Sequence, residues 1–173
     1  MANTQAMCTS FMGELMTATH NFGVAPTRGT SAADTFKAAL FLATANTSSS
    51  TTLCASVTAY ATTVNTIAEV SGAGYTPGGV VITGATTPVW NAPTATNSST
   101  TAGVAFTTPA NSITYTSVTL ATAFDTVLIY NSTQSNKAVS VHTFGSQTVT
   151  AGTFTLTMPS NTTSTALIRL ATT

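Results

Sequence analysis

The sequence predicts an all-β protein, an antiparallel β-sandwich of jelly-roll-like form with a short N-terminal α-helix. Charged residues make up only 5% of the 173-residue chain, against about 25% in an ordinary soluble domain. Threonine and serine supply much of the missing polarity, and β-branched threonine favours the pleated, half-exposed surface of a sheet. At least seven short apolar runs are separated by turn-forming residues, roughly every 8–15 residues, which is typical of sandwiches and jelly rolls.

The first element predicted is a helix over residues 5–21. Apolar side chains recur there at spacings of three and four, and Gly23 follows as a stop signal. The stripe consists of Met7, Phe11, Leu15, Ala18 and Phe22, widened by Met12 and Met16. We expect one domain over residues 1–173, in which residues 1–25 form a helical arm and residues 34–171 form the sandwich.

The segments between this helix and residue 85 carry mixed signals. Residues 36–43 are apolar on both parities, which fits a strand covered on both faces or a short buried helix. Residues 46–52 are predicted to be a polar linker, and residues 53–69 a weak helix or an extended loop. Pro77 and Gly78 match the two central positions of a type II turn, and a strand is predicted at residues 80–83.

The second half of the chain is predicted to be mostly strand. Residues 91–101 are expected to be a polar loop, and residues 131–136 a turn. Strands are expected at residues 103–108, 112–118, 125–131, 137–144, 147–150, 153–158 and 166–171. Residues 125–131 leave neither face polar, which predicts a central strand. The apolar parity switches from Val149 to Phe154, so a tight reversal or a β-bulge is expected at Ala151 and Gly152.

Residues 153–158 indicate which polar side chains face solvent in this protein. Thr153, Thr155 and Thr157 alternate with apolar side chains, and His142 is the one ionisable side chain between Lys137 and Arg169. We expect these threonines on the outward face of a strand, where hydroxyls replace the usual charges.

The titratable side chains form no pattern that predicts catalysis. The acids are Glu14, Asp34, Glu69 and Asp125, and the histidines are His20 and His142. His142 and Asp125 lie on neighbouring predicted strands and could join a serine in a triad, but no nucleophile-elbow motif accompanies them. We favour a structural interpretation, with His142 on the outer face of a strand and Asp125 at a strand start.

Other binding motifs are also missing from the sequence. Cys8 and Cys54 match no metal or redox spacing and are expected to be free and buried. In SGAGYTPGG (71–79), Pro77 stands where a dinucleotide-binding motif needs its third glycine, so the segment is interpreted as a turn. We therefore expect no catalytic, cofactor-binding or metal-binding residues.

The charge content excludes two classes of partner. The net charge is zero and there are four basic residues, whereas a nucleic-acid-binding protein neutralises about 6–10 phosphates and a membrane-surface anchor needs a polybasic cluster. No apolar run reaches the roughly 18–20 residues of a membrane span. The N-terminus lacks a basic region and carries Glu14, so no secretory signal is predicted, and we expect use without export.

Several stretches resemble a family of small proteins encoded among the structural genes of tailed bacteriophages. They are DTFKAALFLATA, EVSGAGYTPGGVVITGA, ITYTSVTLATAFDTVLIYNSTQSNKAVSVHTFGSQTVTAGTFTLTMP and ALIRLA. The resemblance covers residues 34–171 and implies a virion protein assembled in the host cytoplasm. It further implies a capsid cement, or decoration, protein: a jelly-roll homotrimer that binds the major capsid protein and carries no catalytic residues.

Alternatives stay open at this stage. The chain could be a tail or fibre-associated protein or a host-binding module, and an enzyme or a non-phage adhesin is a further alternative. Phe11, Leu15, Met16 and Phe22 are the candidate interface residues, with which the helix would contact another subunit or the capsid. The helix could instead cap the open end of its own sandwich.

Overall fold

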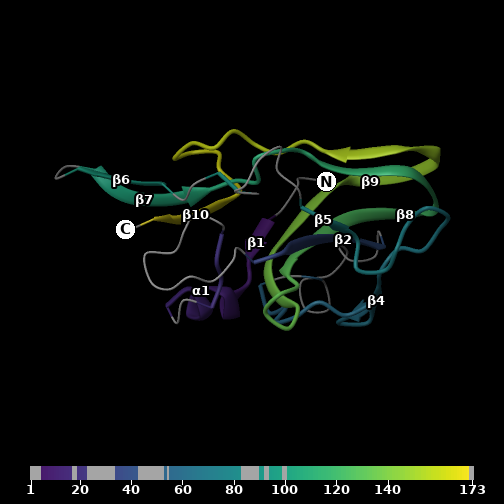
Figure 1. Cartoon of the computed structure of the whole chain (residues 1–173), viewed down its shortest axis with the longest axis horizontal. Helices are drawn as coiled ribbons and strands as arrows, with labels where there is room; N and C mark the ends of the chain where they lie inside the picture. Colours follow the sequence, from purple (N-terminus) through teal and green to yellow (C-terminus); the bar gives the residue numbers. More distant parts are fainter. Residues whose placement is uncertain are drawn as a thin grey trace. The chain divides into compact units, whose positions relative to one another are not determined.

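The computed structural model describes residues 5–16, 19–22, 34–42, 53, 55–82, 90–91, 94–98 and 101–171. This part of the chain contains one helix, α1 (Thr9–Met16), and ten strands in antiparallel sheets (Figure 1). The strands are β1 (Gln5–Met7), β2 (Phe36–Leu42), β3 (Thr63–Val64), β4 (Ile67–Ala68), β5 (Val80–Val81), β6 (Thr94–Ser98), β7 (Thr101–Thr107), β8 (Ile113–Asn131), β9 (Lys137–Leu156) and β10 (Ile168–Ala171). The prediction of a mainly β protein with a short N-terminal helix is confirmed.

The chain divides into two compact units. Unit 1 comprises Met1–His20, Thr35–Val81 and Thr114–Thr155, and unit 2 comprises Asn21–Asp34, Ile82–Ile113 and Leu156–Thr173. Unit 1 contains α1, a five-stranded sheet in the order β1-β9-β8-β2-β5, and the β3-β4 hairpin. Unit 2 contains a three-stranded sheet in the order β10-β7-β6. The expected single domain, with an arm at 1–25 and a sandwich at 34–171, stays a prediction.

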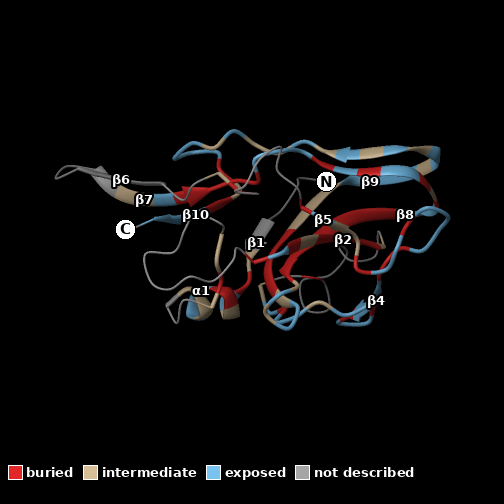
Figure 2. Cartoon of the chain, viewed as in Figure 1, coloured by how far each residue is buried: buried red, intermediate tan, exposed pale blue. Residues whose placement is uncertain are grey.

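The centre of the five-stranded sheet is the C-terminal part of β8. It lies between β9 and β2, and residues 124–131 are all buried (Figure 2). Apolar side chains on both faces thus predicted the central strand correctly. The strand alternative for residues 36–43 also holds, because Phe36 pairs with Asn131 and the ladder continues to Leu40 and Val127.

Strands β8 and β9 are longer than the sequence predicted. Each merges segments that were expected to be separate strands. Ser117 in β8 and Ala151 in β9 have positive φ angles of 53° and 46°. Because β9 continues through Ala151, the expected tight reversal there is wrong, and the alternative of a β-bulge stays a prediction.

Strand β8 folds back over its own sheet. The Oη atom of Tyr115, near its start, donates a hydrogen bond of 2.9 Å to the carbonyl of Ala38 in β2. Ala38 pairs with Ile129, near the end of the same strand. The gap between the two parts is filled by rings: Phe154 lies 5.0 Å from Phe124 and 5.9 Å from Tyr115 between centroids.

The predicted helix over residues 5–21 is wrong at its N-terminal end, and at its other end residues 19–21 are not helical either. Gln5–Met7 forms β1, which pairs with residues 140–142 of β9, and α1 begins only at Thr9. The apolar periodicity misled the prediction because it includes Met7. Backbone groups of β9 need partners in this position, and pairing with them outweighs the local helical preference.

The sequence predicted a weak helix or an extended loop over residues 53–69. The described part contains no helix, so the loop alternative holds outside the β3-β4 hairpin. The turn residues of this hairpin, Asn65 and Thr66, have φ angles of 48° and 70°, as a type I′ turn requires. Residues 94–98, expected to be loop, form β6 and pair with β7.

The type II turn is confirmed, since Gly78 has φ of 95° and the Gly79 amide donates to the Thr76 carbonyl at 3.0 Å. The expected linker at 46–52 lies outside the described residues.

Candidate functional site

The four candidate interface residues have different surroundings. Phe11 is fully buried in unit 1, where its ring centroid lies 4.8 Å from that of His20. Leu15 is half-buried, and the side chain of Met16 lies outside the described part. Phe22 belongs to unit 2 and meets Trp90 edge-on at 5.0 Å. Phe11 therefore offers no surface to a partner while α1 is docked, and the interface as a whole stays a prediction.

His142 and Asp125, the two residues named for the hypothetical triad, have different hydrogen-bond partners. Asp125 is buried within β8 and accepts a hydrogen bond of 2.7 Å from the hydroxyl of Thr126, while burial raises the pKa of its carboxyl. His142 is half-buried in β9, 2.9 Å from the hydroxyl of Ser140, and burial lowers its pKa to about 4. Asp125 thus does not mark a strand start and His142 is not on a fully exposed face, so both parts of the structural interpretation need correction.

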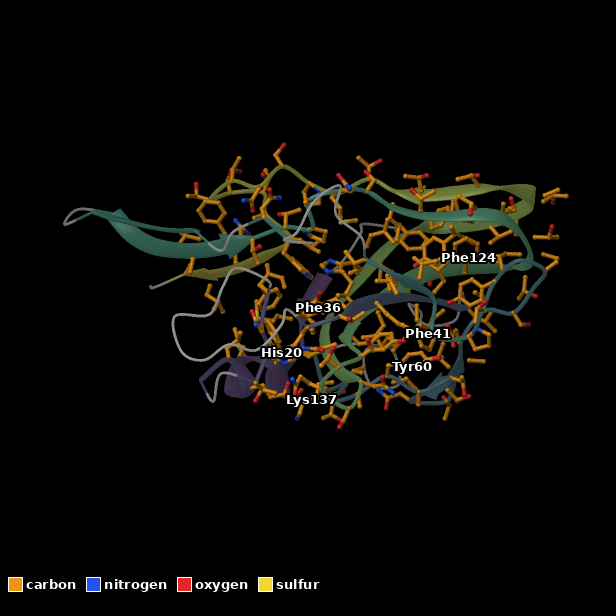
Figure 3. The ribbon with its side chains drawn as sticks, viewed as in Figure 1. His20, Phe36, Phe41, Tyr60, Phe124 and Lys137 are labelled. Atoms are coloured by element: carbon orange, nitrogen blue, oxygen red, sulfur yellow. The ribbon has the colours of Figure 1, made fainter. Side chains whose placement is uncertain are left out.

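The main polar site of unit 1 is one that the sequence did not reveal. Glu69 is 8% exposed, and all four tyrosines of the chain gather around it, directly or through one another. We call this set the Glu69–tyrosine cluster; it consists of Glu69, Tyr60, Tyr75, Tyr115 and Tyr130. Tyr60 stacks on Tyr130 with centroids 4.4 Å apart, and Tyr75 stacks on Tyr115 at 6.0 Å. Phe41 of β2 forms a β-bridge with Glu69, and Figure 3 labels Phe41 together with Tyr60.

Three hydrogen bonds hold the Glu69 carboxylate. Tyr75 donates to Oε1 at 2.6 Å, the Gly78 amide donates to Oε1 at 2.8 Å, and Tyr60 donates to Oε2 at 2.6 Å. The Tyr75 hydroxyl also accepts from the Leu40 amide at 2.9 Å. A buried carboxylate normally needs several such donors, and here they join the turn at residues 76–79 to strand β2.

The surroundings of the cluster keep its phenols neutral. Burial, followed by the charge of Glu69, raises the pKa of Tyr130 to about 12. Burial and the hydrogen bond to Glu69 also raise the pKa values of Tyr60 and Tyr75, and burial raises that of Tyr115. Neutral phenols can donate hydrogen bonds to the carboxylate but are poor proton acceptors. The cluster is therefore suited to holding the surrounding loops and strands together.

The glycines of SGAGYTPGG serve close backbone packing. A Cβ atom on Gly72 would lie 2.0 Å from the Thr119 carbonyl oxygen of β8, and one on Gly79 would lie 1.7 Å from that of Ala38 in β2. Gly79 also has φ of 68°. The sequence interpretation of this segment as turn rather than phosphate loop agrees with these contacts.

A second polar cluster joins the N-terminal segment to the β8-β9 hairpin. Glu14 of α1 binds the Lys137 ammonium at 2.5 Å through Oε1 and the His20 Nε2 atom at 2.7 Å through Oε2. The second ring nitrogen of His20, Nδ1, lies 3.0 Å from the Nδ2 atom of Asn131. Burial alone would raise the pKa of Glu14, but the hydrogen bonds from Lys137 and His20 outweigh this and lower it.

The tautomer of His20 follows from the orientation of Asn131. The Oδ1 atom of Asn131 accepts from the amides of Thr133 and Gln134, at 3.1 and 3.2 Å, so its Nδ2 must donate to His20. His20 therefore accepts at Nδ1 and donates from Nε2 to Glu14. Both ring nitrogens are engaged, and this histidine cannot serve as a general base while these bonds last.

The exposed surface of β8 and β9 carries hydroxyls. The exposed positions include Thr114, Thr116, Ser117, Thr122, Thr148, Thr150, Thr153 and Thr155 (Figure 2). Thr153, Thr155 and Thr157 are exposed while Phe154, Leu156 and Met158 are half-buried, so the predicted outward threonine face is confirmed. The large apolar side chains that are most exposed in the described part are Met12, Val81 and Leu170, at 45%, 44% and 39%.

No protein family, curated protein or solved structure matches the chain. Within the described residues, histidine, cysteine and acidic side chains nowhere gather in threes to hold a metal ion. The helix found in this part of the chain is too short to cross a membrane. Cys8 is buried, as expected, and Cys54 lies outside the described residues.

Proposed function

We propose that the chain is a non-enzymatic structural protein of a tailed-phage virion, and specifically a capsid cement protein that stabilises the head by binding the major capsid protein. The observation that carries this proposal is how the described ionisable groups are used. Glu69, Glu14, His20 and Lys137 tie loops, helix and hairpin together inside unit 1. These ionisable groups make unit 1 rigid, and a protein that stabilises a particle needs a rigid structure.

The hydroxyl-rich surface supports the same proposal. Exposed threonines keep the β8-β9 surface hydrated without a dense layer of charge. Many copies can then lie close together on a particle without repelling each other. Contacts made through such a surface also depend little on salt, because few charges are available to be screened.

The finer architecture belongs to this proposal as well. We assign unit 1 as a jelly-roll-like sandwich, in which the folded-back part of β8 and its β9 partner form the second layer. The hydrogen bond from Tyr115 to Ala38 and the ring contacts of Phe154 support two layers. A homotrimer of such units would bind the capsid without nucleic acid, membrane or cofactor.

Copy number on purified virions tests the proposal. A cement protein is present in a copy number that matches the capsid lattice, and electron microscopy locates it on the outer face of the head. Quantitative mass spectrometry against the major capsid protein gives the ratio. Copies in small multiples of the tail symmetry, or density on the tail, would instead identify a tail or fibre-associated protein. Binding of the isolated protein to host cells would identify a host-binding module.

A further inference from the structure

Lys37 is a cation of unit 1 whose charge is not used inside the protein. It lies in β2 and is half-buried. Within the part of the chain that the structure describes, its ammonium group has no hydrogen bond and no ion pair. The other described cations are engaged. Lys137 binds the Glu14 carboxylate, and Arg169 donates to the Ser164 carbonyl at 2.7 Å. Lys37 can therefore bind a group from outside the chain.

Two tyrosine hydroxyls converge with this ammonium group at the glycine-rich turn. A Cβ atom built on Gly78 would lie 3.1 Å from the Tyr130 hydroxyl and 3.7 Å from the Tyr60 hydroxyl. It would lie 4.0 Å from the Nζ atom of Lys37. The protons of the two phenols are already donated within the protein, to the Glu69 carboxylate at 2.6 Å and to the Gly78 carbonyl at 2.8 Å. The ammonium group is thus the donor that remains, and a ligand must bring an acceptor.

Glu69 does not supply that acceptor. Its carboxylate already accepts hydrogen bonds from two phenols and from the Gly78 amide. Among the described residues, no ion pair joins it to Lys37. A phosphate group, with a charge of about −1.5 to −2 and three acceptor oxygens, would need more donors than one lysine provides. A singly charged carboxylate matches the single ammonium group better.

An exposed apolar side chain lies beside Lys37 on the same face of the sheet. Val81 of β5 is directly opposite Lys37 in the antiparallel ladder, and directly opposite side chains share a face. Val81 is 44% exposed, and β5 is an edge strand of the five-stranded sheet. A free carboxylate ion would leave Val81 uncovered, whereas an acidic residue next to an apolar one contacts both side chains.

We propose that Lys37 and Val81 form a binding site for an acidic segment of a partner protein. A glutamate or aspartate of the segment pairs with the Lys37 ammonium group, and a neighbouring apolar side chain covers Val81. Charge complementarity selects this partner, because the described part of the chain leaves the Lys37 charge unmatched. The inference rests on the proposed function in that the major capsid protein supplies the segment.

Lysine side-chain NMR of the isolated protein tests the proposal. Lys37 and Lys137 are the two lysines of the chain, so isotope labelling of lysine side chains gives two signals. The probes are a blocked Val-Glu-Val peptide, its Val-Gln-Val counterpart, acetate and inorganic phosphate. Val-Glu-Val is expected to shift the Lys37 signal saturably, at a several-fold lower concentration than acetate or phosphate, and Val-Gln-Val to leave it unchanged. Lys137, paired with Glu14, is the internal control and should not move.

Two variants separate the parts of the site. Lys37→Met removes the charge and keeps an unbranched side chain, and the backbone amide signal of Val81 is expected to show that Val-Glu-Val no longer binds. Val81→Ser is expected to make the peptide bind no better than acetate. No virion is used, so the result is independent of the copy number on particles that tests the proposed function. A Lys37 signal that does not move, equal shifts of both lysines, or equal binding of Val-Glu-Val and acetate to the unaltered protein overturns the proposal.

Discussion

Replacing Tyr75 by phenylalanine tests whether the Glu69–tyrosine cluster locks unit 1. The hydroxyl of Tyr75 makes two buried hydrogen bonds, to the Glu69 carboxylate at 2.6 Å and from the Leu40 amide at 2.9 Å. Tyr75→Phe removes the first bond, and a hydrogen bond to a charged group contributes about 1.5–3 kcal/mol. It also leaves the buried Leu40 amide without its acceptor, which costs about 1–3 kcal/mol.

The expected loss in the free energy of unfolding is therefore about 2.5–6 kcal/mol. Tyr60→Phe is the matched control, since it removes a hydrogen bond of the same length to the same carboxylate. Tyr60 is half-buried, and the Gly78 amide, with which its hydroxyl also interacts, keeps the Glu69 carboxylate as an acceptor. Water can replace the Tyr60 hydroxyl, and the loss is expected to be about 0.5–1.5 kcal/mol.

Urea unfolding followed by circular dichroism and by tyrosine fluorescence measures both losses. Combining each variant with Glu69→Gln gives two double-mutant cycles, and the coupling of Glu69 to Tyr75 is expected to exceed its coupling to Tyr60. The reasoning is refuted if Tyr75→Phe changes stability by less than 0.5 kcal/mol, about the noise of a surface substitution, or if Tyr60→Phe costs as much as Tyr75→Phe.

Four further outcomes are expected. Ile129→Ala, at a side chain 1% exposed in the central strand, should cost about 2–5 kcal/mol in urea unfolding, and a loss below about 0.5 kcal/mol would contradict its burial. Gly79→Ala should prevent stable folding, because Gly79 has a positive φ and an added Cβ would clash with the Ala38 carbonyl. Gly13 lies on α1 with open space around it, so Gly13→Ala should stabilise the folded protein by about 0.5–1 kcal/mol. Equal effects of the two variants on the thermal melt would refute this contrast. The folded-state pKa of His142 is lowered from 6.5 to about 4. The stability that neutral His142 contributes is therefore full above pH 6.5 and is lost as the pH falls toward 4. His142→Gln should flatten this part of the curve of stability against pH. The pKa of Tyr130 is raised from 10.0 to about 12. The stability that the neutral phenol contributes is therefore full below pH 10 and is lost as the pH rises toward 12. Phenolate absorbance that rises near pH 10 while the protein is still folded would contradict the burial of the cluster.

The long-range pairing of strands explains most of the errors in the sequence prediction. Residues 5–7 fit a helical stripe, yet they form β1 because β9 presents unpaired backbone groups to them. Residues 94–98 have a polar, loop-like composition, yet β7 pairs with them. Backbone hydrogen bonds to a neighbouring strand do not depend on side-chain polarity, so no local pattern reveals them.

The Glu69–tyrosine cluster shows the same limit for the candidate site. Its members are spread from Tyr60 to Tyr130, and no spacing among them resembles a motif. They meet because β8 folds back over β2 and because the glycine-rich turn lies against both strands. The sequence feature that could have pointed to this site is a single glutamate followed by a glycine-rich turn. On its own, this feature does not predict that four tyrosines gather around the glutamate.

The sequence by itself determined the mainly β class, the central strand at 125–131, the type II turn at Pro77 and Gly78, and the outward threonines of β9. These features depend on local chemistry: side-chain alternation, burial on both faces, and the φ preferences of proline and glycine. Tertiary structure alone decided the fold-back of β8, the attachment of residues 5–20 to β9, and the partners of Glu69, Glu14 and His20. Each of these joins residues far apart in the chain, where the free energy comes from contacts that exist only after the chain has folded.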